Sequence, residues 1–329
     1  MDDIISKRAT ERIDISEPLA CPLMVHIEPT DICTVKCKFC FFQDIEKKRT
    51  FMPMENYKKI INGLKEMGRL KVINLYMGGE SVIHKDIVEM VRLAAEVTDK
   101  TWIKTNGTAL TVELAKDLSK AGLSILTISV LGVNDNDYFK LSGRKIVYSD
   151  MIAKISDIYS AIKGKLWLHC KIADYGMGQE KINKFKKDFS AICDHAGIEY
   201  LYSPAINTTG KDYTLGDKRD IGIQGEHRVE RIVCPFPFYS LIFNADASVV
   251  VCCFDHMRRT KIGDITKSTV KEIWNSKELR DFRIMNLTNN RKRNAFCANC
   301  QHLHFLPDNI DAHREKMYAR LIKEKQYEI

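Results

Sequence analysis

The first two-thirds of the chain alternates short strand-like runs with longer amphipathic segments. The strand-like runs are rich in β-branched and aromatic residues, stop at Gly, Pro, Asp or Asn, and cover residues 23–29, 72–79, 101–107, 124–132, 166–174 and 198–205. Apolar positions at helical spacing fill the segments between them, residues 54–67, 85–98, 111–120, 149–163 and 180–196. This order predicts parallel strands joined by helical crossovers. Because six such units fall short of the eight in a closed barrel, we expect a partial (β/α)6 TIM-like barrel with its functional groups at the carboxyl ends of the strands.

The pattern changes near residue 208. A polar, glycine-bearing stretch there predicts a linker, after which residues 239–253 predict a hairpin turning at Asn244-Ala245-Asp246 and residues 268–286 predict an amphipathic helix. We therefore expect a small α+β domain with a hairpin and a helix after the barrel. The expected divisions are an N-terminal extension over 1–20, a core over 21–207, a linker over 208–230, the small domain over 231–308 and a charged terminal helix over 309–329.

Composition places the chain among globular proteins, since 45% of its 329 residues are hydrophobic and 29% are charged. No apolar run approaches the roughly 18 residues that a membrane span requires, and the N-terminus lacks the apolar core of a secretory signal. We therefore expect a cytoplasmic protein without a membrane partner. In that reducing compartment, 11 cysteines favour metal ligands or buried thiols over disulfides.

The net charge of +8 would move closer to zero if clustered cysteines bind a metal as thiolates. Short basic runs, residues 47–49, 258–259 and 291–293, fit solvated loops better than a binding site for an anion. The sequence has no basic strip interleaved with aromatic residues, so a nucleic-acid partner is not expected.

Three cysteines, Cys33, Cys37 and Cys40, lie within eight residues on the loop after the first predicted strand. Thiolates at that spacing can wrap one face of a [4Fe–4S] cluster and leave its fourth iron without a protein ligand. An open coordination position indicates reactivity, by the logic that separates catalytic from structural zinc sites. An ordinary zinc site is the alternative, but nothing nearby supplies a fourth ligand at zinc-finger spacing.

Here the sequence resembles the radical S-adenosylmethionine (SAM) superfamily, whose CxxxCxxC motif it carries as CTVKCKFC, with Phe39 before the last cysteine. The residues YMGGES, at the end of the second predicted strand, match the GGE motif of that family. The resemblance implies that the amino and carboxylate groups of SAM chelate the open iron. It also implies that Gly78, Gly79 and Glu80 bind the methionine amino group, with glycine allowing a close approach of the backbone.

The same resemblance points to Asn106 in KTNGT and Ser129 in TISVLG, at the places where family members contact the carboxylate and ribose of SAM. Turn and capping roles for these two residues remain an open alternative. The implied chemistry is reductive cleavage of SAM to a 5′-deoxyadenosyl radical, which abstracts a hydrogen atom from the substrate. The implied partner is a one-electron donor such as flavodoxin or ferredoxin.

A second cysteine group lies in the predicted small domain and comprises Cys234, Cys252, Cys253, Cys297 and Cys300. Four thiolates suit either a fully ligated [4Fe–4S] cluster or a tetrahedral zinc site. The surrounding sequence resembles the auxiliary-cluster domain called SPASM, or its shortened form, twitch. With no cysteine after the CANC motif, the resemblance implies one auxiliary cluster held by Cys234, Cys252, Cys297 and Cys300. Since adjacent residues of a strand face opposite sides, Cys253 is a spare or replaces Cys252.

Three neighbours in the fifth predicted strand, His169, Cys170 and Lys171, are candidates for catalysis. Cys170 could donate a hydrogen atom to a substrate radical if it faces the barrel interior. Lys171 could be a general base or contact an anionic substrate. Structural packing is the alternative for Cys170, as it is for Cys21 and Cys193, because buried free cysteines are common.

The leading functional hypothesis is a radical SAM enzyme that oxidises a small polyol, sugar or aminocyclitol, with the auxiliary cluster accepting an electron. The first alternative is maturation of a ribosomally made peptide by epimerisation, cross-linking or oxidation. Only about twenty residues precede the first predicted strand, which disfavours a leader-binding domain there. An alternative from another class is a non-catalytic, zinc-bearing RNA-binding module, which a colourless, iron-free protein would favour.

Overall fold

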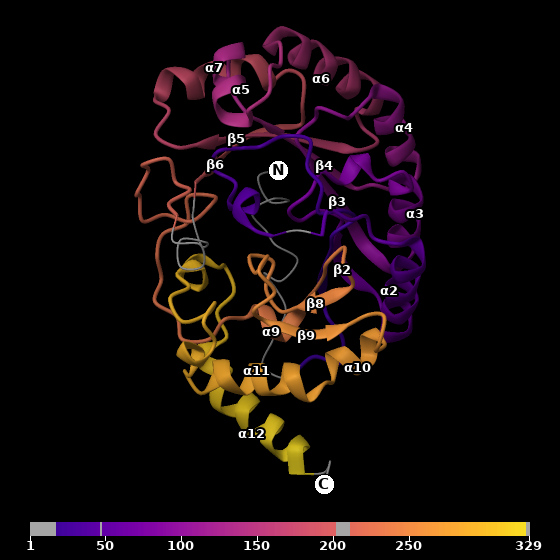
Figure 1. The fold of residues 1–329 in the computed structure, drawn as a ribbon, viewed down its shortest axis with the longest axis vertical. Helices are drawn as coiled ribbons and strands as arrows, with labels where there is room; N and C mark the ends of the chain where they lie inside the picture. The colour runs from indigo at the N-terminus through magenta and orange to yellow at the C-terminus, as the bar shows by residue number, and fades with distance from the viewer. Residues whose placement is uncertain (1–17, 47, 202–210, 327–329) are drawn as a thin grey trace.

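The fold is built around one curved, open sheet, here described from a computed structural model that covers residues 18–46, 48–201 and 211–326 (Figure 1). Its first six strands are β1 (Met24–Ile27), β2 (Leu70–Asn74), β3 (Thr98–Thr105), β4 (Ile125–Val130), β5 (Trp167–Asp174) and β6 (His195–Tyr200). They lie in chain order and every neighbouring pair is parallel. The predicted partial barrel is confirmed, because β6 ends the sheet without pairing back to the opposite edge. Most of the predicted N-terminal extension, and residues 202–205 of the sixth predicted strand, lie outside the described residues.

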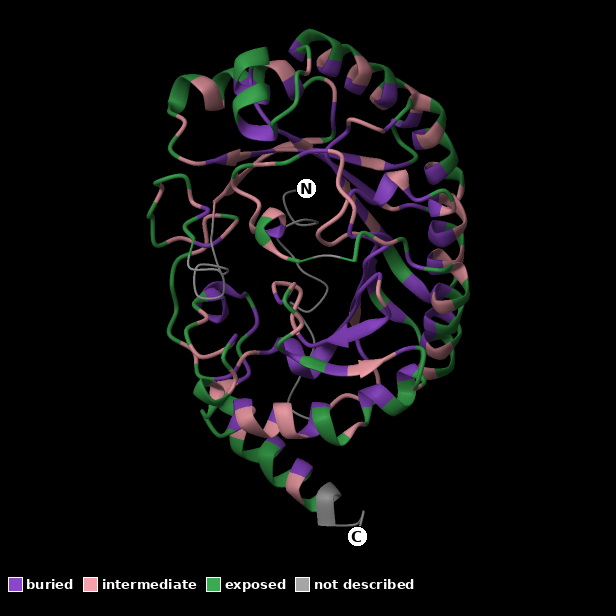
Figure 2. Cartoon of the chain, viewed as in Figure 1, coloured by how far each residue is buried: buried purple, intermediate pink, exposed green. Residues whose placement is uncertain are grey.

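Helices cover the outer face of this sheet, and Figure 1 shows them following one another around its rim. They are α2 (Met54–Met67), α3 (Ile87–Val97), α4 (Val112–Lys120), α5 (Asp135–Ser142), α6 (Tyr148–Ile162) and α7 (Gln179–Phe189). Buried residues on these helices face the strands and exposed residues face outward (Figure 2). Between strands and helices lies the main apolar core, which includes Leu64, Ile73, Ile103, Leu126 and Ile158.

The sequence pattern missed α5, which is short and mostly polar. Its ends carry clear local signals. The Asn134 side chain accepts a hydrogen bond from the Asp137 N–H at 2.8 Å, and Gly143 ends the helix with a left-handed φ of 69°. Eight residues are too few for apolar periodicity to stand out from the flanking loops.

The C-terminal region continues the same sheet. It contains α9 (Phe236–Tyr239), β7 (Ser240–Phe243), β8 (Ser248–Val250), β9 (Lys261–Asp264), α10 (Val270–Trp274), α11 (Lys277–Leu287) and α12 (Arg314–Gln326). β7 pairs in parallel with β1, and β8 then pairs antiparallel with β7, which confirms the predicted hairpin. The sheet therefore runs unbroken from the barrel into the region of the second cysteine group.

The helix predicted over 268–286 is two helices. Thr269 and Glu272 form a capping box at the start of α10, and the Ser276 side chain accepts a hydrogen bond from the Leu279 N–H at 3.2 Å to start α11. A second apolar cluster packs α9, α11 and α12 together, including Phe238, Tyr239, Leu287, Leu303 and Met317. Within the described parts of the chain, no helix has the length and apolar character needed to cross a membrane.

Candidate functional site

The loop that carries Cys33, Cys37 and Cys40 runs from β1 to a 3-10 turn, η1 (Phe41–Asp44). The C-terminal end of α5 holds this loop in place. The Lys36 N–H donates to the Ser142 carbonyl and the Lys38 N–H to the Leu141 carbonyl, each at 2.9 Å. Carbonyls in the last turn of a helix lack hydrogen-bond donors within the helix. The N–H groups of the cysteine loop supply these donors at the end of α5. A helix that the sequence pattern missed thus sets the geometry of the first cysteine group.

The three thiols of this loop lie close enough to influence one another. Burial raises the pKa of Cys37 well above its ordinary value, and the thiols of Cys40 and Cys33 raise it further. Ligation to iron would favour the thiolates, because the metal places positive charge directly beside the sulfur atoms. All three cysteines remain partly exposed. The loop therefore fits a cluster with one open side.

No three His, Cys, Asp or Glu side chains among the described residues meet closely enough to hold a single metal ion. In a [4Fe–4S] cluster each thiolate binds a different iron, so its ligands stand further apart than those of one ion. Phe39, inside the motif, packs against the main core and anchors the loop to it.

Gly78 and Gly79 follow β2 and pack directly under the cysteine loop. A Cβ atom on Gly79 would overlap the Thr30 carbonyl, and one on Gly78 would overlap the Phe42 ring. Neither glycine has a positive φ. Glycine is therefore required at both positions for close packing between the two loops, in addition to the predicted approach to SAM.

Glu80 and Asn106 join this arrangement from the ends of two neighbouring strands. The Asn106 N–H donates to Glu80 Oε2 at 2.7 Å, and burial raises the pKa of Glu80. The Asn106 side-chain amide donates to Thr34 Oγ1 at 2.9 Å and lies 3.7 Å from Cys33 Sγ. The fold thus brings together three motifs that lie far apart in sequence. Hydrogen bonds to ligand sulfurs are one means of tuning the potential of a cluster.

Ser129, His169 and Lys171 lie on the inner face of the sheet. Ser129 is in register with Lys171 on the next strand, and His169 Nδ1 lies 3.3 Å from Thr127 Oγ1. Burial lowers the pKa of His169 to about 3, so this imidazole is neutral. His169 therefore offers hydrogen-bonding groups but little basicity.

Sequence reasoning missed two charged residues that complete this inner wall, Lys104 on β3 and Glu199 on β6. Glu199 forms an ion pair with Lys171, and its other carboxylate oxygen lies 3.8 Å from Lys104 Nζ. Burial would raise the pKa of Glu199, but the charges of Lys171 and Lys104 outweigh it and hold the pKa at about 2. Strand alternation within 101–107 and 198–205 could have assigned each side chain to one of the two faces of its strand, but not which of these faces lies inside.

The predicted role of Cys170 as a hydrogen donor in the barrel interior is wrong. His169 and Lys171 occupy the inner face, so alternation along β5 turns Cys170 toward the helices. There it is fully buried in the main core, and a hydrogen bond with Cys193 and burial together raise its pKa. The packing alternative accounts for both cysteines.

The cysteines of the second group also lie close together. Burial raises the pKa of Cys234, and the thiols of Cys300 and Cys297 raise it further. Cys252 has its pKa raised by a hydrogen bond with Cys253, by burial and by neighbouring thiols. The expectation that these adjacent residues face opposite sides assumed a strand, but β8 ends at Val250 and the two cysteines lie in the loop beyond it. The choice between them as the fourth ligand therefore remains a prediction.

Arg291 provides positive charge beside the second group, contrary to the expectation that the run 291–293 is a solvated loop. Its guanidinium donates to the Cys297 carbonyl at 3.4 Å, and its charge acts to lower the pKa of Cys234 and Cys300. Lys292 and Arg293 are exposed as expected. A cation here partly offsets the charge of clustered thiolates, so this group also fits an iron–sulfur cluster.

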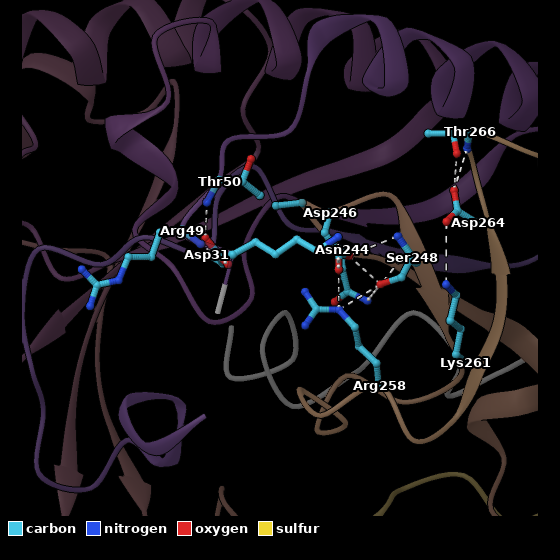
Figure 3. A network of polar contacts seen from close by, with 12 residues as sticks. Asp31, Arg49, Thr50, Asn244, Asp246, Ser248, Arg258, Lys261, Asp264 and Thr266 are labelled. Atoms are coloured by element: carbon cyan, nitrogen blue, oxygen red, sulfur yellow. Dashed lines mark hydrogen bonds and ion pairs between the residues drawn. The ribbon is translucent and has the colours of Figure 1, made fainter. Parts of the chain in front are cut away.

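The loops that follow the two cysteine groups contact each other. The His256 ring lies 4.9 Å from that of Phe41 and 5.0 Å from that of Phe42, measured between ring centroids. Figure 3 shows a polar network nearby, in which Arg258 binds Asp246 at 3.0 Å. Lys48, from the loop after the first group, reaches the same carboxylate at 3.7 Å. The loops beside the two candidate metal centres are therefore in direct contact.

Comparison with known families decides between the possible interpretations of these cysteines. Residues 27–190 match the model of the radical SAM superfamily, and residues 234–301 match that of SPASM, an iron–sulfur cluster-binding domain. The chain belongs to the radical SAM superfamily. Its two domains imply a SAM-binding [4Fe–4S] cluster and an auxiliary cluster, and both cysteine groups described above fit these cofactors.

Curated relatives of this radical SAM chain match it over limited stretches. It is 31% identical over 129 residues to the PqqA peptide cyclase of Bradyrhizobium diazoefficiens, covering 39% of this chain and 33% of the relative. It is 35% identical over 111 residues to the Fe-coproporphyrin III synthase of Methanosarcina barkeri, covering 33% and 27%. The chain therefore spans a third or less of the length of these relatives.

Solved radical SAM structures match over most of the chain. SuiB of Streptococcus suis, bound to the precursor peptide SuiA, has a TM-score of 0.66 at 16% identity, covering 98% of this chain and 77% of that chain. BtrN in complex with AdoMet and 2-DOIA has a TM-score of 0.57 at 15% identity, covering 89% and 99%. At these identities the likeness shows a shared fold.

Glu28, just after β1, ties the radical SAM sheet to the hairpin of the SPASM region. Its carboxylate oxygens accept hydrogen bonds from the Gly78 and Ala245 N–H groups, each at 3.2 Å. The side chain is almost fully buried, and this burial raises its pKa to about 7. A group that holds its proton more tightly when folded makes the folded state less stable as pH rises.

We expect the stability of the protein to show this titration. Between the ordinary value of 4.5 and about 7, the folded state retains a proton on Glu28 that the unfolded state releases, so stability falls as pH rises through that window. The difference corresponds to roughly 3 kcal/mol. Urea unfolding at pH 5 and pH 8 should therefore show a smaller pH dependence for Glu28→Gln than for the unmodified protein. An equal change in exposed Glu66→Gln would contradict the assignment to Glu28.

Proposed function

We propose that this radical SAM enzyme oxidises a small, polar substrate, a polyol, sugar or aminocyclitol, by abstracting a hydrogen atom from one of its carbons. The observation that carries the proposal is the charged inner wall formed by Lys104, Lys171 and Glu199. These side chains extend inward from β3, β5 and the C-terminal half of β6, toward the strand ends where the cysteine loop lies.

A polyhydroxylated or amino substrate suits this wall. Its hydroxyl or amino groups can donate to Glu199 and its oxygens can accept from Lys104 and Lys171. The Lys171 and Glu199 side chains are 16% and 18% exposed, so an apolar substrate would remove their remaining hydration without replacing it. Neutral His169 and Thr127 add further hydrogen-bonding groups. This is the physical basis for preferring a polar substrate.

The bound cofactors supply reductive cleavage of SAM and an acceptor for the electron that the substrate radical releases. The chain itself holds these groups and orients the substrate. The proposed ligands of the first cluster are Cys33, Cys37 and Cys40, with Asn106 beside Cys33. The proposed ligands of the auxiliary cluster are Cys234, Cys297, Cys300 and either Cys252 or Cys253. Once the substrate is bound against the inner wall, the wall and the substrate together exclude water from the target carbon.

Maturation of a peptide is the second candidate. It is favoured by the similarity to the PqqA peptide cyclase and by the likeness in fold to SuiB bound to its precursor peptide. A peptide would reach the same inner wall with one side chain, and a polar or charged side chain would suit it best. The two candidate substrates therefore differ in the part that lies beyond the inner wall. The polar groups that would contact the wall are of the same kind in both.

The fate of deuterium distinguishes them. The protein, purified without oxygen and reduced with dithionite, is mixed with SAM and with ring-deuterated polyols or aminocyclitols, including 2-deoxy-scyllo-inosamine. We expect deuterium in 5′-deoxyadenosine and a ketone in the product. A parallel assay in heavy water contains a precursor peptide in place of the small substrates. Solvent deuterium at one carbon of that peptide, with no deuterium transfer from any small substrate in the first assay, would instead establish peptide epimerisation.

A further inference from the structure

The ammonium of Lys104, on the inner wall, has no hydrogen-bond acceptor among the residues that the structure describes. Glu199 Oε1 lies 3.8 Å from Lys104 Nζ, beyond hydrogen-bonding distance, and Glu199 Oε2 accepts from Lys171 instead. The side chain of Lys104 is only 28% exposed, so water reaches part of it. An ammonium carries three N–H donors, and burying donors without acceptors costs free energy. These open donors indicate that a ligand supplies the missing acceptors.

Two aromatic rings position the Lys104 ammonium. Its Nζ lies 4.9 Å from the centroid of the Tyr76 ring and 5.2 Å from that of the Trp102 ring. The faces of these rings attract a cation, but they do not replace oxygen acceptors. The indole N–H of Trp102 donates to Thr127 Oγ1 at 2.8 Å, which fixes the orientation of that ring. Because Tyr76 comes two residues before Gly78, the ammonium lies beside the segment that carries the predicted SAM-binding glycines.

The inner wall carries one more positive charge than negative charge. Strands β3 to β6 contain three acids, and two of them pair with arginines outside the wall. Asp99 pairs with Arg69 at 2.7 Å. Asp174 pairs with Arg219 at 3.0 Å. The third acid, Glu199, faces both lysines of the wall and can balance only one of them.

We propose that the substrate carries one anionic oxygen group, a carboxylate or a phosphate, that accepts hydrogen bonds from Lys104. The inference rests on the proposed function and narrows its substrate class to polyols and sugars that bear an acid group. Such a group supplies the acceptors that the ammonium lacks and cancels the excess charge of the wall. Hydrogen bonds between two charged groups are roughly twice as strong as those between neutral groups, so the wall distinguishes an acid group from a hydroxyl.

The first experiment compares probes that differ only in the anionic group. Calorimetry on the reconstituted protein with SAM, without a reductant, measures the affinity for glucose and glucuronate and for myo-inositol and myo-inositol 1-phosphate. We expect the charged member of at least one pair to bind about tenfold more tightly or better than its neutral partner. A preference for glucuronate alone would identify the group as a carboxylate, and a preference for the inositol phosphate alone would identify it as a phosphate.

A matched pair of variants then tests Lys104 itself. Lys100 lies four residues earlier on β3 and is exposed, so Lys104→Met and Lys100→Met have the same net charge and alter the same strand. Methionine keeps an unbranched side chain against the two rings and removes the ammonium. We expect Lys104→Met to lower the affinity for the charged probe about tenfold and that for its neutral partner much less. Lys100→Met should keep the preference, and Lys104→Arg should retain most of it because the charge remains.

Two outcomes would overturn the proposal. If the unmodified protein binds no charged probe more tightly than its neutral partner, the wall does not select an anion, and this comparison does not depend on the folding of any variant. If Lys104→Met weakens the charged and neutral probes equally, Lys104 has only a structural role. The proposed oxidation fails separately, when no deuterated sugar or polyol, charged or neutral, transfers deuterium to 5′-deoxyadenosine. That failure is distinguishable because the calorimetric comparison requires no reaction.

Discussion

Replacing Cys37 with alanine should abolish cleavage of SAM, reducing it by at least about a thousandfold. Cys37 is the middle ligand of the proposed first cluster, and its neighbours Cys33 and Cys40 lie on the same short loop. Two thiolates cannot hold the cluster in place of three, so the open iron that would bind SAM is lost. The measurement is 5′-deoxyadenosine released by dithionite-reduced protein after reconstitution with iron and sulfide.

Cys21→Ala is the matched control, since Cys21 is a partly exposed cysteine outside both groups. It should retain cleavage close to that of the unmodified protein. Iron analysis separates loss of the cluster from loss of the fold, because Cys37→Ala should keep the auxiliary iron. Normal 5′-deoxyadenosine formation by Cys37→Ala would falsify the assignment of this loop to SAM cleavage.

Replacing Cys297 with alanine should remove the auxiliary cluster and stop product formation while leaving part of the SAM cleavage intact. The iron content should fall from about eight to about four per chain, since one of two [4Fe–4S] clusters is lost. Cys297 lies in the second group, with its carbonyl bound by Arg291, and does not contact the first cysteine loop through any described hydrogen bond. The two clusters therefore have separate ligand sets, even though their loops touch.

The adjacent cysteines provide the control for this experiment. Cys252→Ala and Cys253→Ala change neighbouring thiols that both lie close to other cysteines of the second group. Only the variant that lacks the true ligand should lose auxiliary iron as Cys297→Ala does. Product formed at the normal rate by Cys297→Ala would mean that the auxiliary site has no part in the chemistry.

The inner wall shows what strand alternation can and cannot predict about the direction of a side chain. Alternation in β5 correctly implies that Cys170 faces away from His169 and Lys171, but it does not say which face is inside. That choice depends on where the helices pack, and the structure places them on the side of Cys170. Lys171 and Glu199 lie on adjacent strands separated in sequence by the whole of α7. Lys171 is opposite Gly197 and Glu199 is opposite Ala173, so the ion pair runs diagonally across the face that the two side chains share.

In the second cysteine group, the position of a strand end likewise limited what the sequence could predict. The assumption that Cys252 and Cys253 continue a strand depended on a strand boundary, and β8 ends two residues earlier. Arg291 likewise belongs to a basic run that, by composition alone, suits a solvated loop. Only packing of its turn beside the cysteines separates it from the exposed Lys292 and Arg293.

The sequence by itself determined the resemblance to the family, the order of the six parallel strands, most of the crossover helices, and both cysteine groups, because ligand spacing and hydrophobic period are local properties of the chain. Tertiary structure alone decided that the SPASM hairpin extends the barrel sheet, that α5 supports the cysteine loop, and that Lys104 and Glu199 join Lys171. These features depend on contacts between segments that are distant in sequence. The free energy of such contacts comes from burial and charge in the assembled core, which no short window of residues contains.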